Sequence, residues 1–262
     1  MVLAITLIAA YLIGGIMSMF IYRWPREIKI FSRRLIPDTN MYTKWYESIP
    51  VLGYIVTLGK YQNQTKKSIL EVVIPILNIV SYLVIYLLYN EVVGSFIFMG
   101  FISVLICVSC IDFKYMLIPD RSHVIILLLG IVSLVCELNI YYDEFGDIFH
   151  LEMYEWFIGL LVGFLPIYLL GIIISKLKGT EALGGGDVKL LGASGFLIGW
   201  KNILLAMVIG SCIALIVEKL LQGLKIRKED EPFAFGPYLA IAMIICVMVG
   251  PYLINWYLGL FS

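Results

Sequence analysis

The sequence has no excess of either charge, because 19 Lys and Arg residues balance 19 Asp and Glu residues over 262 positions. Charged residues make up only 15% of the chain. A balanced chain offers no broad basic surface for nucleic acid, so we expect no nucleic-acid partner. Histidine is also scarce: His123 and His150 stand alone in the sequence, and we assign neither a catalytic role.

Cysteine is scarce as well, and none of the five cysteines precedes Cys107. All five lie in apolar stretches, at Cys107, Cys110, Cys136, Cys212 and Cys246. Cys107 and Cys110 form a C-x-x-C pair, but no second Cys or His pair has the spacing of a zinc site. The sequence therefore predicts small buried apolar side chains at these positions, with no disulfide framework and no metal site.

Apolar residues, by contrast, make up 61% of the chain, where a soluble domain has about 45–50%. They gather in blocks of roughly twenty residues, the length of helix that crosses about 30 Å of hydrocarbon. We therefore expect an all-α, polytopic membrane protein with about eight transmembrane helices. The expected spans are residues 2–22, 69–89, 92–111, 123–141, 155–175, 188–199, 203–221 and 236–258. The sixth is short, so it is expected to begin within the preceding glycine run.

The distribution of basic residues predicts how these spans are oriented. Residues 23–68 carry nine Lys and Arg residues, whereas residues 142–154 carry acidic residues and no basic ones. Because basic loops remain in the cytoplasm, residues 23–68 should form one larger cytoplasmic loop, with both termini outside. Residues 23–68 are too few to bury much of a core, so this loop is expected to pack against the lipid bilayer surface.

Two acidic residues lie at the ends of expected spans, where an ionisable side chain is often functional. Asp112 ends the third span. One interpretation is an interfacial carboxylate that pairs with Lys114 or Arg121, and the other is a catalytic group. Asp120 has a clearer structural explanation, because Pro119 suits the start of a helix and an acidic residue suits its first turn.

Asp187 opens the sixth span, directly after three glycines at residues 184–186. The carboxylate could simply cap the helix, but a cap does not need three glycines. Glycine allows unusual dihedral angles and close approach of another backbone, as an extended substrate beside a catalytic side chain would require. A phosphate-binding loop fits less well, because the G-x-x-x-x-G-K-[ST] pattern is incomplete and the carboxylate would repel phosphate.

The predicted topology places Asp112 and Asp187 on the same side of the membrane and at similar depth. Two carboxylates that share a site cannot easily both ionise, so one holds a proton near neutral pH. One can then act as general base on a water molecule while the other polarises the scissile carbonyl. Because such a pair titrates as a unit, the sequence leaves open which residue is the base.

Four motifs, in order along the chain, resemble those of the bacterial prepilin leader peptidases, a family of polytopic membrane aspartic peptidases with a G-x-G-D motif. Residues 184–190 (GGGDVKL) carry the strongest match, and residues 111–120 fit the family's I-D-x(5)-I-P-D stretch. Residues 232–239 (PFAFGPYL) resemble its P-F-G-P-[FY]-L stretch, with the match on residues 235–239. Residues 14–25 resemble its N-terminal motif, although Ser18 replaces the family's Asn.

The resemblance implies that Asp112 and Asp187 are the catalytic aspartates, and Gly184 and Gly186, which flank Asp187, are the best candidates for substrate binding. The implied reaction removes the short basic leader of a prepilin or pseudopilin, after a glycine, at the cytoplasmic face of the cytoplasmic (inner or plasma) membrane. The partner is then a substrate with a basic leader followed by an apolar helix, and the peptidase reaction needs no cofactor. The resemblance also divides the chain into an N-terminal, methyltransferase-like region (residues 1–91) and a peptidase membrane core (residues 92–262).

Many members of that family also methylate the new N-terminus with S-adenosylmethionine, through a first cytoplasmic loop that often carries two C-x-x-C pairs for zinc. This sequence keeps Ile49-Pro50-Val51-Leu52-Gly53-Tyr54, Gly59-Lys60 and Glu71, but has Tyr61-Gln62-Asn63-Gln64 where one C-x-x-C would fall. A cysteine zinc tetrad is therefore excluded, whereas S-adenosylmethionine binding and methylation stay open.

Three other interpretations stay open at the level of sequence. Glycine-broken spans with carboxylates also describe ion-coupled transporters, although Glu137 and Glu218 lie near span ends and are expected to reach the interface. A non-catalytic scaffold could use the basic loop to bind anionic lipid. A different G-x-G-D peptidase could cut other membrane helices, but the matches at residues 14–25 and 235–239 favour the prepilin family.

Overall fold

The computed structural model describes residues 2–26, 70–89, 93–135, 152–178, 184–228 and 231–260. Within these ranges the regular elements are all helical, which confirms the expected all-α fold. Most of the expected cytoplasmic loop and of the acidic outer loop lies outside the described residues, together with Cys136, Glu137 and His150. The chain divides into two compact units, Met1–Leu87 and Leu88–Ser262.

The first unit pairs helix α1 (Val2–Arg23) with most of helix α3 (Leu70–Tyr89), and the short 3-10 helix η1 (Trp24–Arg26) follows α1. A Cβ on Gly14 would lie 2.6 Å from Pro75 Cα, so the missing side chain lets the two backbones come close. The buried Asn78 donates a hydrogen bond from Nδ2 to the Ala10 carbonyl at 2.9 Å. Small residues and interhelical hydrogen bonds are the usual basis of helix association in lipid.

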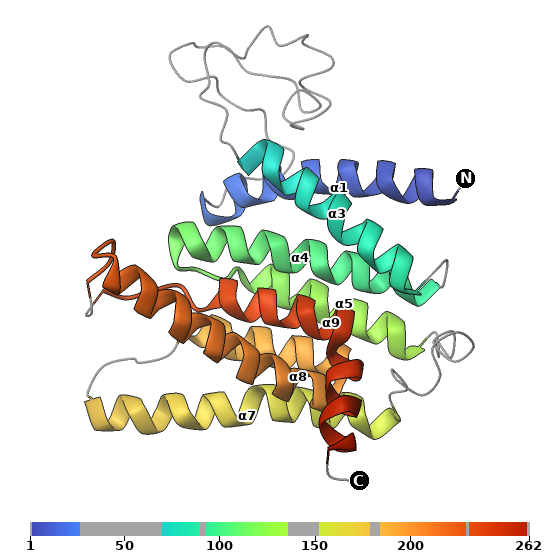
Figure 1. Ribbon diagram of the computed structural model, residues 1–262. Helices are drawn as coiled ribbons and strands as arrows, with labels where there is room; N and C mark the ends of the chain where they lie inside the picture. The colour runs from blue at the N-terminus through green and yellow to red at the C-terminus, as the bar shows by residue number, and fades with distance from the viewer. Residues whose placement is uncertain are drawn as a thin grey trace, which may run out of the picture. The chain divides into compact units, whose positions relative to one another are not determined.

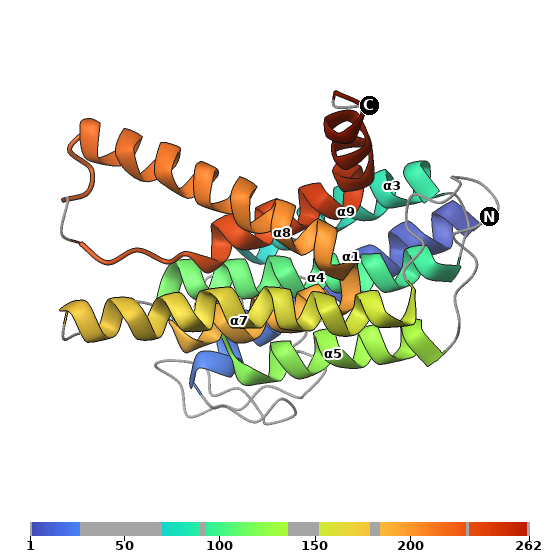
Figure 2. The ribbon, with the colours of Figure 1, turned by 90° about the horizontal axis from the view of Figure 1, so that it is seen from below.

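The second unit contains α4 (Val93–Tyr115), α5 (Asp120–Val135), α7 (Met153–Lys178), α8 (Gly185–Gly223) and α9 (Gly236–Gly259). Helix α8 packs against α5, α7 and α9, while α4 packs against α5 and α9 (Figures 1 and 2). Phe101 and Leu105 of α4, Leu191 of α8 and Leu239 of α9 are fully or almost fully buried. These side chains form the apolar core around which the site is built.

Several helices expose apolar side chains that a protein in water would bury. Helix α7 exposes Leu161, Leu165, Leu169 and Ile173, a continuous apolar surface of the kind that faces lipid. Four described helical segments are long and apolar enough to cross a membrane, at Val2–Ile21, Gly94–Tyr115, Met153–Leu177 and Gly185–Gly223, and two shorter ones are Val73–Tyr89 and Gly236–Gly250. The chain is thus a multi-pass membrane protein, while the number of crossings and the position of its termini stay predictions.

Helix α8 contains a break at Gly199, where the backbone has φ 80° and ψ 166°. A positive φ is strained for residues with a Cβ and accessible to glycine. The break lies at the end of the expected sixth span, and α8 begins within the glycine run as the sequence predicted. Next to it, the buried Glu155 of α7 accepts a hydrogen bond from Trp200 Nε1 at 3.1 Å and lies 3.3 Å from Lys201 Nζ. These contacts of Glu155 connect α7 to the break in α8.

Helices α7 and α8 meet through glycines that bring their backbones into direct contact. A Cβ on Gly159 would clash with the Gly195 carbonyl oxygen, and one on Gly163 would clash with the Leu191 carbonyl oxygen. In both cases the obstructing atom belongs to the backbone, which cannot rotate away as a side chain can. This contact places the first half of α8, and with it the Asp187 end, against α7.

We expect Gly159→Ala to destabilise the protein by about 1–3 kcal/mol, because the added methyl group forces the two backbones apart. The measurement is thermal unfolding in detergent. Gly223→Ala is the matched control, since a Cβ there meets no atom within 4 Å. Equal melting temperatures for the two variants would contradict the close α7–α8 contact.

Candidate active site

Asp112 lies in the last turn of α4, and only 5% of the residue is exposed. The helix ends shortly afterwards, where Met116 adopts a left-handed φ of 51° and donates its N–H to the Asp112 carbonyl at 2.8 Å. Helix α5 then begins at Asp120, directly after Pro119, as the sequence predicted. Among the described residues Asp112 pairs with neither Lys114 nor Arg121, which removes the interfacial ion pair as its explanation.

Asp187 lies in the first turn of α8, where a negative charge interacts favourably with the helix dipole. Its N–H donates to the Gly184 carbonyl at 3.1 Å, so Gly184 caps the helix through its backbone. Gly184 has an ordinary extended conformation, and unusual dihedral angles are therefore not its role. Close approach matters at Gly186 instead, where a Cβ would lie 3.0 Å from Ile118 Cβ.

The segments that carry the two aspartates come together at this point. Ile118, from the connection between α4 and α5, lies beside Gly186 and also beside Gly236, the first residue of α9. Gly236 donates its N–H to Asp112 Oδ2 at 3.0 Å. The fold thus brings together three of the motifs singled out from the sequence, at residues 111–120, 184–190 and 235–239.

The two carboxylates have different surroundings. Asp112 accepts the Gly236 hydrogen bond, whereas Oδ1 of Asp187 is buried and has no hydrogen-bond partner among the described residues. A buried polar atom in that state needs an explanation. A carboxyl oxygen left open beside a second carboxylate is suited to a shared proton, a water molecule or a substrate carbonyl.

Gly184 and Gly186 both precede Asp187 in the chain, but they differ in exposure. Gly184 and Gly185 are exposed, and a Cβ on Gly185 would meet no atom within 4 Å. Gly186 is half-buried against Ile118. An extended peptide could therefore lie along the first two glycines without displacing any side chain. The sequence did not predict Gly236 as a site residue, although residues 235–239 resemble a motif of the family.

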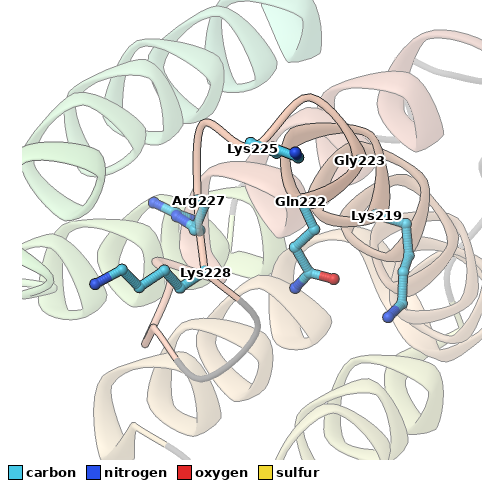
Figure 3. A pocket seen from close by; sticks show the side chains of 6 residues that line it. All are labelled: Lys219, Gln222, Gly223, Lys225, Arg227 and Lys228. Carbon is cyan, nitrogen blue, oxygen red and sulfur yellow. The ribbon is translucent and has the colours of Figure 1, made fainter.

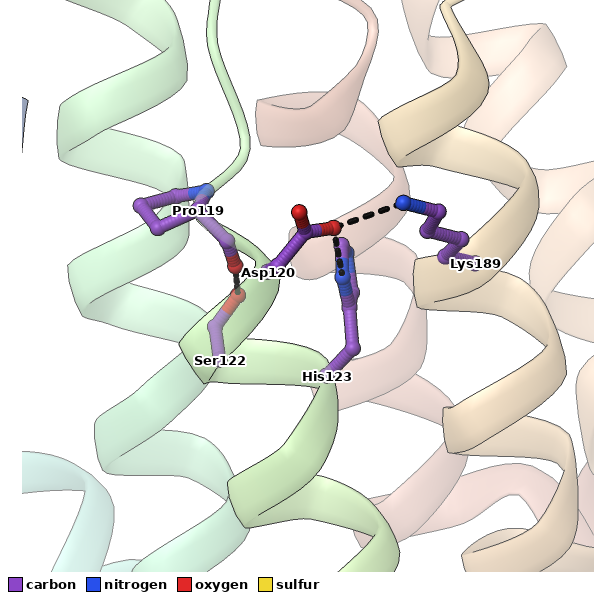
Figure 4. Close-up of polar contacts among 5 residues, drawn as sticks. All are labelled: Pro119, Asp120, Ser122, His123 and Lys189. Atoms are coloured by element: carbon purple, nitrogen blue, oxygen red, sulfur yellow. Dashed lines mark hydrogen bonds and ion pairs between the residues drawn. The ribbon is translucent and has the colours of Figure 1, made fainter.

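A second polar cluster, formed by Asp120, His123 and Lys189, joins α5 to α8 (Figure 4). Lys189 Nζ lies 2.7 Å from Asp120 Oδ1, and His123 Nδ1 lies 3.6 Å from the same oxygen. The hydrogen bond and positive charge of Lys189 hold the pKa of Asp120 below its ordinary value. The acidic residue at the start of α5 is thus more than a helix-dipole partner, because it links residues 111–120 to residues 184–190.

Glu218, which the sequence places near the end of a span, is buried within the second unit, with 6% of the residue exposed. Arg227 Nη1 donates to both of its carboxylate oxygens, at 2.7 and 2.8 Å, and the Tyr238 hydroxyl donates to Oε1 at 2.7 Å. Beyond this cluster, a basic pocket of about 660 Å³ is lined by Lys219, Gln222, Gly223, Lys225, Arg227 and Lys228 (Figure 3).

Among the described helices, no group of three or more His, Cys, Asp or Glu side chains is arranged to hold a metal ion. Cys107 and Cys246 are buried as predicted, whereas Cys212 is exposed on the apolar surface of α8, so the predicted burial is wrong there. Residues 61–64, where the family's C-x-x-C would fall, lie outside the described residues.

Comparison with known proteins decides the family. Residues 99–218 match the type IV leader peptidase family, and residues 8–92 match the bacterial peptidase A24 N-terminal domain. The chain belongs to the type IV leader peptidase family. Membership makes the protein a peptidase, rather than a transporter or a passive scaffold. Both aspartates brought together by the fold lie in the segment matched by the peptidase profile.

Two relatives from this leader peptidase family align over most of their length. A prepilin leader peptidase/N-methyltransferase of Pectobacterium carotovorum is 27% identical over 259 residues, which is 88% of this chain and 87% of the relative. One of Vibrio cholerae is 27% identical over 219 residues, 80% of this chain and 82% of the relative. No solved structure is a significant match to the chain.

We expect the Asp120–Lys189 ion pair to join α5 and α8 with a modest effect on stability, because the Asp120 side chain is 77% exposed and exposed pairs contribute little. Asp120→Lys and Lys189→Asp should each lower the melting temperature by about 2–4 °C or less, and the double reversal should recover most of the loss. Melting curves at low and high salt provide the measurement. Additive losses in the double variant would show that the two charges do not interact.

Proposed function

We propose that the protein is an aspartic endopeptidase that removes the short basic leader of prepilins or pseudopilins, with Asp112 and Asp187 as the catalytic pair. The observation that carries the proposal is the convergence of these two carboxylates from separate helices of the matched peptidase segment. The names of the two relatives described above, both prepilin leader peptidase/N-methyltransferases, support the substrate class.

The chemistry follows from two carboxylates that share one proton. The ionised carboxylate takes a proton from a water molecule, whose oxygen attacks the scissile carbonyl carbon. The protonated carboxyl polarises that carbonyl oxygen and transfers its proton to it. When the tetrahedral intermediate collapses, the C–N bond breaks and the first carboxyl gives the departing amine the proton that it took from water. The second carboxyl takes a proton back from a hydroxyl group of the intermediate, so both groups return to their starting states. This mechanism requires that the two carboxyl groups lie close together and that neither of them is held in a permanent ion pair.

The surroundings of the pair leave room for an extended substrate on the cytoplasmic side of the membrane. Gly184 and Gly185 provide an open backbone edge next to Asp187. Lys114, Arg121 and Lys189 lie close in sequence to the two aspartates, and basic residues at span ends favour the cytoplasmic side of the cytoplasmic membrane. The leader would then remain in water while the following apolar helix stays in the bilayer.

The N-terminal region, residues 1–91, is the proposed site of a second reaction, N-methylation of the new N-terminus with S-adenosylmethionine. The match of residues 8–92 to the bacterial N-terminal domain and the N-methyltransferase in the relatives' names support this proposal. Residues 92–262 then form the peptidase core. Because the sequence lacks a cysteine zinc tetrad, methyl transfer here would proceed without that scaffold.

Asp112→Asn and Asp187→Asn should each reduce cleavage of a prepilin-like peptide by at least about 100-fold, since each removes one partner of the acid–base pair. The peptide would carry a short basic leader that ends in glycine, followed by an apolar helix, in detergent or lipid. Glu152→Gln is the control: it replaces an exposed carboxylate just before α7, outside the site, and its activity should stay close to that of the wild type. Retained cleavage in both Asp112 and Asp187 variants would refute the pair.

With S-adenosylmethionine present, we expect the mass of the cleaved product to increase by one methyl group, located at the new N-terminus by fragmentation. The control is Asp187→Asn, which should yield neither cleavage nor methylation because methyl transfer needs the freed amine. A product that is cleaved at the normal rate but never methylated would limit this chain to the peptidase reaction.

A further inference from the structure

The first turn of α9 meets the catalytic pair through its backbone. Gly236 N–H donates to Asp112 Oδ2 at 3.0 Å, and among the described residues this is the hydrogen bond that the Asp112 side chain receives. A Cβ on Gly236 would lie 2.6 Å from that oxygen and 3.1 Å from Ile118 Cδ1. Glycine at this position therefore allows an amide to contact the carboxylate directly, at the start of a helix.

That turn is itself held in place two residues later. Tyr238 donates its hydroxyl to Glu218 Oε1 at 2.7 Å, and Arg227 donates to both oxygens of Glu218. Burying a carboxylate is unfavourable unless it is paired and fully hydrogen-bonded, and these partners meet that requirement. The Glu218–Arg227–Tyr238 cluster thus joins α8, the segment that follows it and the first turn of α9.

We infer that Gly236 is a positioning residue for Asp112, and that the Glu218–Arg227–Tyr238 cluster fixes the turn that presents its amide. The inference rests on the proposed aspartic peptidase function. It assigns a role to residues 235–239, which the aspartate pair by itself does not explain. An amide donor orients a carboxylate oxygen in one direction and binds the ionised form strongly. Since a displacement of about 1 Å can lower a rate by about 100-fold, the effect should fall on turnover more than on substrate binding.

The test compares Gly236→Ala with Gly250→Ala, a matched substitution on the same helix. A Cβ on Gly250 would lie 2.5 Å from Asn202 Oδ1, so each variant forces a methyl group against a side-chain oxygen. Only the oxygen next to Gly236 belongs to the aspartate pair. Gly236→Ala should lower kcat for the prepilin-like peptide by about 10–100-fold, with KM within about twofold. Gly250→Ala should retain kcat even if both variants lose similar thermal stability.

A milder variant tests the cluster without adding volume. Tyr238→Phe removes only the hydroxyl group that reaches Glu218. It should lower kcat by about 3–10-fold, because it displaces the first turn of α9 less than Gly236→Ala does. Tyr252→Phe, on the exposed surface of the same helix, should have no effect. In the Gly236→Ala background, Tyr238→Phe should add little further loss, because both changes act on the same hydrogen bond.

The outcomes separate this inference from the proposed function. If Asp112→Asn abolishes cleavage while Gly236→Ala turns over like Gly250→Ala, the aspartic pair stands and the positioning role is refuted. A fall in kcat for Gly250→Ala equal to that for Gly236→Ala would likewise refute it, by showing a general packing effect. A wild-type protein that cannot cleave the peptide would overturn the proposed function and this inference together.

Discussion

The arrangement of the second unit depends on holding two carboxylates together in a protein whose interior and membrane surface are both apolar. Each charge taken from water loses hydration free energy, and two charges close together also repel each other. The fold limits this cost by placing both groups beside the N-terminal ends of helices, where backbone N–H groups and the helix dipole favour negative charge. Asp112 receives an amide at the end of α4, and Asp187 lies at the positive end of α8. The pair can stay close because each carboxylate is stabilised by the N-terminal end of a helix, α9 for Asp112 and α8 for Asp187.

Glycine is what brings the helices close enough for that contact. Gly159 and Gly163 let α7 and α8 touch through their backbones, Gly186 lets the first turn of α8 reach Ile118, and Gly236 lets α9 reach Asp112. In lipid, where apolar side chains gain little by leaving the solvent, such close packing is a main source of helix association. The same small residues therefore serve the stability of the unit and the geometry of its site.

Polar side chains then fix the orientation that packing leaves open. Three clusters do this, at Glu155 beside the bend in α8, at Asp120 between α5 and α8, and at Glu218 between α8 and α9. Glu155 and Glu218 are buried and have several partners, so losing one partner would leave a buried charge unsatisfied. Asp120 is exposed, so its ion pair with Lys189 contributes little stability and mainly orients α5 relative to α8. Buried and exposed carboxylates thus have different parts in positioning the same helices.

The sequence by itself determined the fold class, the apolar helices and the two aspartates, because these depend on composition, helix length and residue identity within short motifs. It also separated residues 188–199 from residues 203–221 as two spans, and the structure has one helix, α8, with a break at Gly199, the last residue of the first of them. Only the tertiary structure decided that Gly236 binds Asp112, that Lys189 pairs with Asp120, and that Glu218 is buried with Arg227 and Tyr238. Of these contacts, Gly236–Asp112 and Lys189–Asp120 join residues 124 and 69 positions apart. Spacing along the chain cannot reveal such pairs, because they form only where helix packing brings the ends of different helices together.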